Sequence, residues 1–111
     1  MPINYEQAIQ EFEGDKDLVD TLITKFLEDL KNQIGNLRKS LNKGDLTTIR
    51  TEAHKIKGGA SNLTAIPLAD TAKNLEAFSE SGNISEIKKH LEKVELESKK
   101  LRVFFENLSA E

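Results

Sequence analysis

The chain has 111 residues, of which 37% are hydrophobic, 32% charged and 5% aromatic, with a formal net charge of −3 and no cysteine. This length predicts a single domain over residues 1–111, and the composition favours helices, because strands draw on aromatic and β-branched residues. The missing cysteines exclude disulfides, thiolate catalysis and cysteine-ligated zinc, and the negative charge opposes approach to nucleic acid or an anionic membrane.

The sequence first predicts a short helix followed by a long one. The short helix runs from about residue 5 to 12 and ends before Gly14, which suits the left-handed position that follows a helix. Asp15 is the expected N-cap of the second helix, residues 15–43, and Gly44 closes it. Apolar side chains recur in this helix every three or four residues, as expected when one face is buried. They are Leu18, Leu22, Phe26, Leu30, Ile34, Leu37 and Leu41.

A third helix, residues 46–63, has Asp45 as its expected N-cap. A break follows, in which Thr64 can cap a fourth helix. Pro67 falls in the first turn of that helix, where its missing N–H is not needed. The fourth helix ends near Gly82, and its apolar stripe comprises Leu68, Ala72, Leu75 and Phe78.

Asn83 is the expected N-cap of a fifth helix, with Glu86 at the third helical position, as in a capping box. Its apolar residues are less regularly spaced: Ile84, Ile87, Leu91, Val94, Leu101, Phe104, Phe105 and Leu108. Four long helices with short connections pack most simply as an antiparallel up-down four-helix bundle. The sequence therefore predicts an all-α fold of this kind, with the short first helix covering one end.

One histidine on the third helix is expected to face solvent. Helical geometry places His54 about 130° from the centre of the apolar face, so its imidazole should project outward. That face comprises Leu46, Ile49, Ala53, Ile56, Ala60 and Leu63. Gly58 is the i+4 neighbour of His54, although a glycine destabilises a helix interior by roughly 0.8–1.0 kcal/mol relative to Ala. We expect Gly58 to clear room above the ring, and Gly59, nearer the apolar face, to allow close helix packing; Ser61 shares the outer face.

The outer face of this helix suits phosphoryl transfer. An exposed imidazole has an ordinary pKa of about 6.5 and is largely neutral, hence nucleophilic, at cytoplasmic pH. Lys57, one turn further on, can hold a negatively charged group near the ring, and Arg50 and Lys55 add positive potential. No Gly-rich nucleotide-binding loop occurs, so we expect a phosphocarrier without kinase or hydrolase activity of its own.

The residues from His54 onward resemble the core motif of histidine-containing phosphotransfer (HPt) domains of bacterial two-component phosphorelays. The family motif is His-x-[apolar]-Lys-Gly-small-[small]-x-x-[apolar]-Gly, and this sequence reads HKIKGGASNLT over residues 54–64. The stretches GDKDLVDTLITKFLEDL and LADTAKNLE are also similar to segments of the family. Thr64 departs from the pattern, since the family usually has Gly there.

The resemblance implies a monomeric helical bundle that accepts a phosphoryl group on His54 from a receiver-domain aspartate and passes it to another receiver. Lys57 would assist near the phosphoryl group, and Gly58 would keep the histidine accessible. The implied partners are response-regulator receiver domains and a hybrid sensor histidine kinase. No cofactor is implied on this chain, and Mg²⁺ would be held by the partner receiver.

Other functions have weaker support. His54 and His90 are far apart in the sequence and no HExxH motif occurs, so no metal site is predicted, and His90, among several lysines, is interpreted as a solvated surface residue. Ser61 lies two turns from His54 without a nucleophile elbow, which argues against a hydrolase. The main alternative is a phosphate-independent helical adaptor that binds a regulatory protein. Nucleic-acid binding, suggested by the lysines of the last helix, is opposed by the acidic balance and the absence of stacking aromatics.

Membrane and export signals are not evident in the sequence. No apolar run approaches the roughly 20 residues needed to span a bilayer. The N-terminal MPINYEQ lacks the charged-then-apolar pattern of a signal peptide. We therefore expect a cytoplasmic protein that does not bind membranes.

Overall fold

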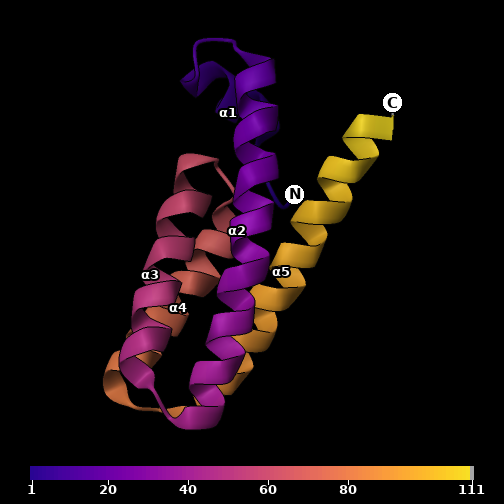
Figure 1. Ribbon diagram of the computed structural model, residues 1–111. Helices are drawn as coiled ribbons and strands as arrows, with labels where there is room; N and C mark the ends of the chain where they lie inside the picture. The colour runs from indigo at the N-terminus through magenta and orange to yellow at the C-terminus, as the bar shows by residue number, and fades with distance from the viewer. Residues whose placement is uncertain (111) are drawn as a thin grey trace.

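The computed structural model describes the backbone of residues 1–110 and the side chains of residues 1–108 (Figure 1). In this part of the chain there are five helices and no strand: α1 (Tyr5–Glu11), α2 (Lys16–Lys43), α3 (Leu46–Asn62), α4 (Ile66–Ser81) and α5 (Ile84–Ala110). The four long helices reverse direction at each short connection, while α1 packs against α2 (Figure 1). The predicted all-α bundle with a short additional N-terminal helix is confirmed.

Most helix ends follow the predicted capping residues. The side chains of Asp15, Asp45 and Asn83 each accept a hydrogen bond from a first-turn backbone N–H, at 3.0, 3.1 and 3.2 Å respectively. Gly44 and Gly82 end α2 and α4 in the left-handed conformation, with φ of 70° and 74°. These local signals satisfy the free backbone groups at the helix ends and make the connections short, so that consecutive helices lie antiparallel.

The start of α4 differs from the prediction. Its N-cap is Ala65, which makes no side-chain capping bond, although Pro67 does lie in the first turn. Thr64 instead follows the end of α3 with φ of 60°, a left-handed conformation that β-branched residues rarely adopt. Its hydroxyl does not cap α4 because it donates to the carbonyl oxygen of Asn4 at 2.6 Å.

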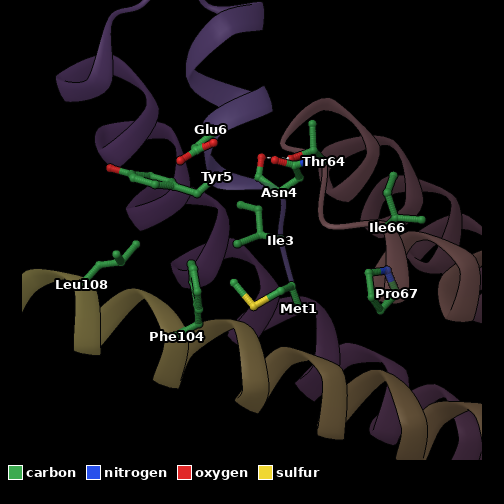
Figure 2. Close-up of a pocket in the computed structure, with 10 residues that line it drawn as sticks. All are labelled: Met1, Ile3, Asn4, Tyr5, Glu6, Thr64, Ile66, Pro67, Phe104 and Leu108. Carbon is green, nitrogen blue, oxygen red and sulfur yellow. Dashed lines mark hydrogen bonds between the residues drawn. The ribbon is translucent and has the colours of Figure 1, made fainter.

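The first four residues run between α5 and the corner that joins α3 to α4 (Figure 2). Ile3 is buried and belongs to the hydrophobic core. The Asn4 amide donates to the carbonyl of Thr64 at 3.2 Å, which ties this segment to the corner. A groove of about 580 Å³ lies beside the segment, with Tyr5 and Phe104 among its lining residues (Figure 2).

The buried face predicted for α3 is confirmed. Five residues of this face are buried: Ile49, Ala53, Ile56, Ala60 and Leu63. Leu46, the first residue of the face, is partly buried and packs at the edge of the core. They join one cluster of buried side chains contributed by all five helices and by Ile3. Because this core fixes the rotation of α3 about its axis, it also fixes the direction of the outer face.

The apolar stripe predicted for α2 is wrong at its beginning. Leu18 is 42% exposed, and the buried side chains of the first turns are Val19 and Ile23. The predicted stripe runs from Leu18 to Leu30 in three steps of four residues, and each step turns about 400° around the helix, which is about 40° more than a full turn. Leu18 therefore lies about 120° from the buried Leu30. Ile84 is also 42% exposed, because it is the first residue of α5 and lies at the end of the bundle.

The prediction that His90 is a solvated surface residue is also wrong, since only 7% of it is exposed. It lies three residues after Ile87 and four before Val94, both of which are buried, so helical spacing places it on the inner face of α5. Its Nδ1 lies 2.8 Å from the backbone carbonyl oxygen of Glu86, and its ring centroid is 4.9 Å from that of Phe78. The neighbouring lysines are exposed on the other side of the helix.

Candidate functional site

The imidazole of His54 projects from the outer face of α3, as the sequence predicts. The side chain is 65% exposed, whereas Ala53 beside it and Ile56 two residues further on are fully buried. The ring is therefore attached to a helix that the core holds in place. Its exposure leaves it accessible to a large partner.

A carboxylate from α4 joins His54 to Lys57. One oxygen of Glu76, Oε2, lies 3.0 Å from Nδ1 of His54, and the other, Oε1, accepts a hydrogen bond from Nζ of Lys57 at 3.1 Å. Helices α3 and α4 lie side by side, which brings these residues together across 22 and 19 positions of sequence. Within the described part of the chain, Nε2 of His54 has no hydrogen-bond partner.

The carboxylate of Glu76 is held in its ionised form. Burial alone raises the pKa of this carboxyl, but the hydrogen bonds and charges of Lys57 and His54 outweigh burial and lower the pKa below its ordinary value. Only 19% of the side chain is exposed, so these hydrogen bonds face limited competition from water. The site therefore has a fixed negative charge behind the ring and a cation beside it.

The two glycines after His54 have different surroundings. A Cβ at Gly58 would meet nothing within 4 Å, so the space over this position is open. A methyl group there would not touch the imidazole, so only a longer side chain at Gly58 could crowd the ring. A Cβ at Gly59 would lie 2.7 Å from the ring of Phe26 on α2, so α3 approaches this ring closely at a position without a side chain.

The remaining predicted site residues lie around His54 without hydrogen-bonding to it. Nη1 of Arg50 lies 3.9 Å from Oε1 of Glu80, and Nζ of Lys55 lies 3.8 Å from Oε1 of Glu52. Both basic side chains are at least half exposed. Together with His54, Thr51 and Glu76 they line a shallow cavity of about 340 Å³. Ser61 is exposed, and within the described residues its hydroxyl makes no hydrogen bond.

Glu76 is the residue of this site that was not predicted from the sequence, although its spacing from buried residues of α4 indicates where it lies. It follows the buried Leu75 and lies four residues after the buried Ala72, so it falls at the edge of the inner face of α4. A carboxylate placed there needs a partner, because burying an unpaired charge is costly. The neighbouring helix carries two basic side chains at the matching edge.

Neither a cluster of metal ligands nor a membrane-spanning helix is found among the described residues. Among the described residues, no three His, Asp or Glu side chains are grouped so as to hold a metal ion. No described helix combines the length and apolar character that crossing a membrane requires.

Comparisons with known proteins point to one family. The sequence model of the Hpt domain matches residues 21–110, which include every residue of the site. The crystal structure of histidine-containing phosphotransfer protein B (HptB) from Pseudomonas aeruginosa PAO1 is similar to this chain, with a TM-score of 0.87 and 27% sequence identity over 96% of this chain and 92% of that chain. No curated protein sequence matches the chain significantly.

Proposed function

Because the chain belongs to the Hpt domain family, we propose that it is a phosphorelay intermediate in which His54 carries the phosphoryl group. The group would come from the phosphorylated aspartate of one receiver domain and pass to the aspartate of another. The observation that carries this proposal is the exposed imidazole, with Nε2 unbonded and Lys57 beside it. The likeness to HptB, named a phosphotransfer protein, supports the same function.

The chemistry needs one nucleophile and one cation. The lone pair of Nε2 attacks phosphorus, the bond from phosphorus to the aspartyl oxygen breaks, and the receiver carboxylate leaves with the electron pair. The proton on Nδ1 stays in place, so the phosphorylated ring becomes cationic. Positioning and charge stabilisation account for most of the catalysis of such transfers, and Lys57 can pair with the phosphoryl oxygens.

The proposal assigns the other parts of the reaction to the partners. A hybrid sensor histidine kinase would supply phosphoryl groups through its receiver domain, and Mg²⁺ would be bound by the receiver. This chain would act as a monomeric phosphocarrier that holds no cofactor. Arg50 and Lys55, half exposed around the cavity beside His54, would attract the acidic surface of a receiver.

The test is transfer of radiolabelled phosphate from a phosphorylated receiver domain. The parent protein should acquire a label that is labile in acid and stable in alkali, as expected of a phosphohistidine. His54→Gln should remove the label. His90→Gln is the matched control, because it changes the buried histidine, and it should retain the label. A label that persists in His54→Gln would contradict the assignment of His54 as the phosphoacceptor. Binding of the receiver without any transfer would contradict the proposal and favour a phosphate-independent adaptor.

A further inference from the structure

We propose that a groove between α5 and the N-terminal segment binds an amphipathic helix of a partner protein, and that this helix presents carboxylates to two lysines. The groove, called the α5 groove below, has a volume of about 410 Å³. Its lining residues are Pro2, Leu96, Lys99, Lys100, Val103 and Phe104. The inference does not depend on the proposed function of His54.

Exposed hydrophobic side chains gather along this part of the molecule. Leu96 is 51% exposed and Val103 is 43% exposed, and both line the α5 groove. Two more exposed side chains, Met1 and Ile66, line the neighbouring groove of about 580 Å³ (Figure 2). Phe104 lines both grooves, so the two adjoin. Exposed apolar side chains that collect in one place are typical of a surface that binds another protein.

The shape of this surface fits a second helix. From Leu96 to Val103 the lining residues recur at spacings of three and four, so they lie along one face of α5. From Leu96 to Leu108, which lines the neighbouring groove, α5 extends about 18 Å, or about three turns of a partner helix. Insertion of the apolar face of a helix into a groove is a common mode of recognition between proteins.

The wall that the N-terminal segment contributes is held in place. Ile3, next to Pro2, is buried in the core, and the backbone N–H of Asn4 donates to the carbonyl of Thr64. The groove is therefore formed before a partner arrives. A preformed groove lowers the entropic cost of binding.

The charges of the α5 groove favour an acidic partner. Its two charged lining residues, Lys99 and Lys100, are both exposed. Nζ of Lys100 lies 3.2 Å from Oε1 of Glu97, whereas Lys99 forms no ion pair with any residue that the structure describes. Carboxylates on a partner helix would meet these ammonium groups, while lysines in the same positions would be repelled.

Two other occupants fit this face less well. A second copy of the chain, related by a two-fold axis through the groove, would bring the same lysines against each other. An anionic bilayer would also meet Glu92 and Glu106, exposed carboxylates about one turn outside either end of residues 96–103. A flat bilayer surface would also leave a groove of this volume unfilled.

The α5 groove is remote from His54. Helices α3 and α5 each pack on α2 and α4, which separate them (Figure 1). The imidazole is 65% exposed on the outer face of α3. A helix bound in the groove would therefore leave the imidazole accessible, and one chain could hold a second protein while His54 meets a receiver domain.

The first experiment measures fluorescence anisotropy with two labelled synthetic peptides of about 18 residues, or about five helical turns. Both carry leucines at every third or fourth position, flanked by glutamates in one peptide and by lysines in the other. The acidic peptide should bind at least about 10-fold more tightly than the basic one, and added salt should weaken its binding. Equal affinity for the two peptides, or no binding of the acidic peptide at millimolar concentration, would overturn the proposal.

Variants of the groove test where the acidic peptide binds. Leu96→Glu and Val103→Glu should each weaken its binding about 10-fold or more, because a carboxylate replaces an apolar contact. Leu18→Glu is the matched control: Leu18 is 42% exposed but lies on α2 outside both grooves, so this variant should bind like the parent. The double variant Lys99→Glu, Lys100→Glu should prefer the basic peptide. Thermal unfolding should verify that every variant folds. Parent-like binding by both Leu96→Glu and Val103→Glu would overturn the proposal.

Two further measurements test the other occupants. The chain should not sediment with vesicles of phosphatidylglycerol and phosphatidylcholine, and light scattering should give the mass of a monomer at every concentration. Vesicle binding, or a dimer that Leu96→Glu abolishes, would overturn the proposal in favour of a membrane or a second copy. His54→Gln should bind the acidic peptide like the parent, so the result stands apart from phosphoryl transfer.

Discussion

Asn4 and Thr64 are joined by two hydrogen bonds (Figure 2). The backbone N–H of Asn4 donates to the backbone carbonyl of Thr64 at 3.2 Å, and the hydroxyl of Thr64 donates to the backbone carbonyl of Asn4 at 2.6 Å. They join the N-terminal segment to the corner between α3 and α4, 60 residues away in the sequence. The hydroxyl bond compensates for the left-handed backbone of Thr64, which costs about 1–2 kcal/mol in a β-branched residue.

Two substitutions at Thr64 should separate the hydrogen bond from the strain. Thr64→Ala keeps the unfavourable backbone and loses the hydroxyl, so it should reduce the free energy of unfolding by about 1 kcal/mol. Thr64→Gly also relieves the strain, so its stability should lie closer to the parent. Urea-induced unfolding would measure both. A Thr64→Ala variant as stable as the parent would show that the hydroxyl contributes nothing.

Gly59→Ala should destabilise the protein although it improves helix propensity. The new methyl group would lie 2.7 Å from a ring carbon of Phe26, and overpacking of this kind costs about 1–3 kcal/mol. The gain in propensity of about 0.8–1.0 kcal/mol offsets only part of that cost. Chemical denaturation should therefore show a net loss of about 1 kcal/mol. In a Phe26→Leu background the same change should be neutral or stabilising, and an equal loss in both backgrounds would refute the contact.

Gly58→Leu should separate stability from transfer. The position is open, so the variant should unfold at a higher temperature, with a gain of up to about 1 kcal/mol, yet transfer should slow because the side chain obstructs the partner near His54. Gly35→Leu is the matched control: it fills an equally open helical position on α2 and should raise stability without slowing transfer. Unimpaired transfer in Gly58→Leu would remove the proposed reason for that glycine.

Stability should fall as the solution becomes acidic, and two carboxylates should contribute. Burial alone raises the pKa of Glu76, but hydrogen bonds from Lys57 and His54 lower it below its ordinary 4.5. Burial likewise raises the pKa of Asp20, and hydrogen bonds from Lys16 and Tyr5 lower it below its ordinary 3.8. The unfolded chain then binds more protons than the native one at these sites. Their contribution is therefore fully present above the unfolded pKa values and is lost as the pH falls through the lower, native ones.

The measurement is urea unfolding at about pH 6 and about pH 3.5. Glu76→Gln and Asp20→Asn should each lose less stability between these two pH values than the parent does. Equal losses in the parent and in both variants would show that neither carboxylate contributes to the acid sensitivity.

The features that the sequence predicted correctly depend on neighbours in the chain. Helix ends were set by Asp15, Asp45, Asn83 and two glycines that act within a few residues of themselves. The outward direction of His54 followed from the apolar spacing of its own helix. These signals operate within one helix, so no knowledge of the other helices was needed.

The features that were missed depend on contacts between distant segments. The periodicity of α3 gives the direction of His54, and that of α4 places Glu76 at the edge of a buried face, but neither pattern says that these two residues meet across 22 positions. The bond from Thr64 to Asn4 spans 60 positions and has no local signal. His90 is a different case, because its spacing from Ile87 and Val94 indicated burial, and the flanking lysines obscured that signal.

The carboxylate at the back of His54 also affects how the proposed phosphorylated state can be imitated. Asp or Glu at position 54 would be a poor surrogate for phosphohistidine, because its negative charge would sit close to that of Glu76 and compete for the single ammonium of Lys57. Two like charges around one lysine would favour protonation of one acid or a rearranged side chain. A phosphorylated histidine differs, because its ring carries positive charge on the side of Glu76 and its phosphoryl group carries negative charge at the tip. A non-hydrolysable phosphohistidine analogue, which retains the azole ring, would preserve that polarity.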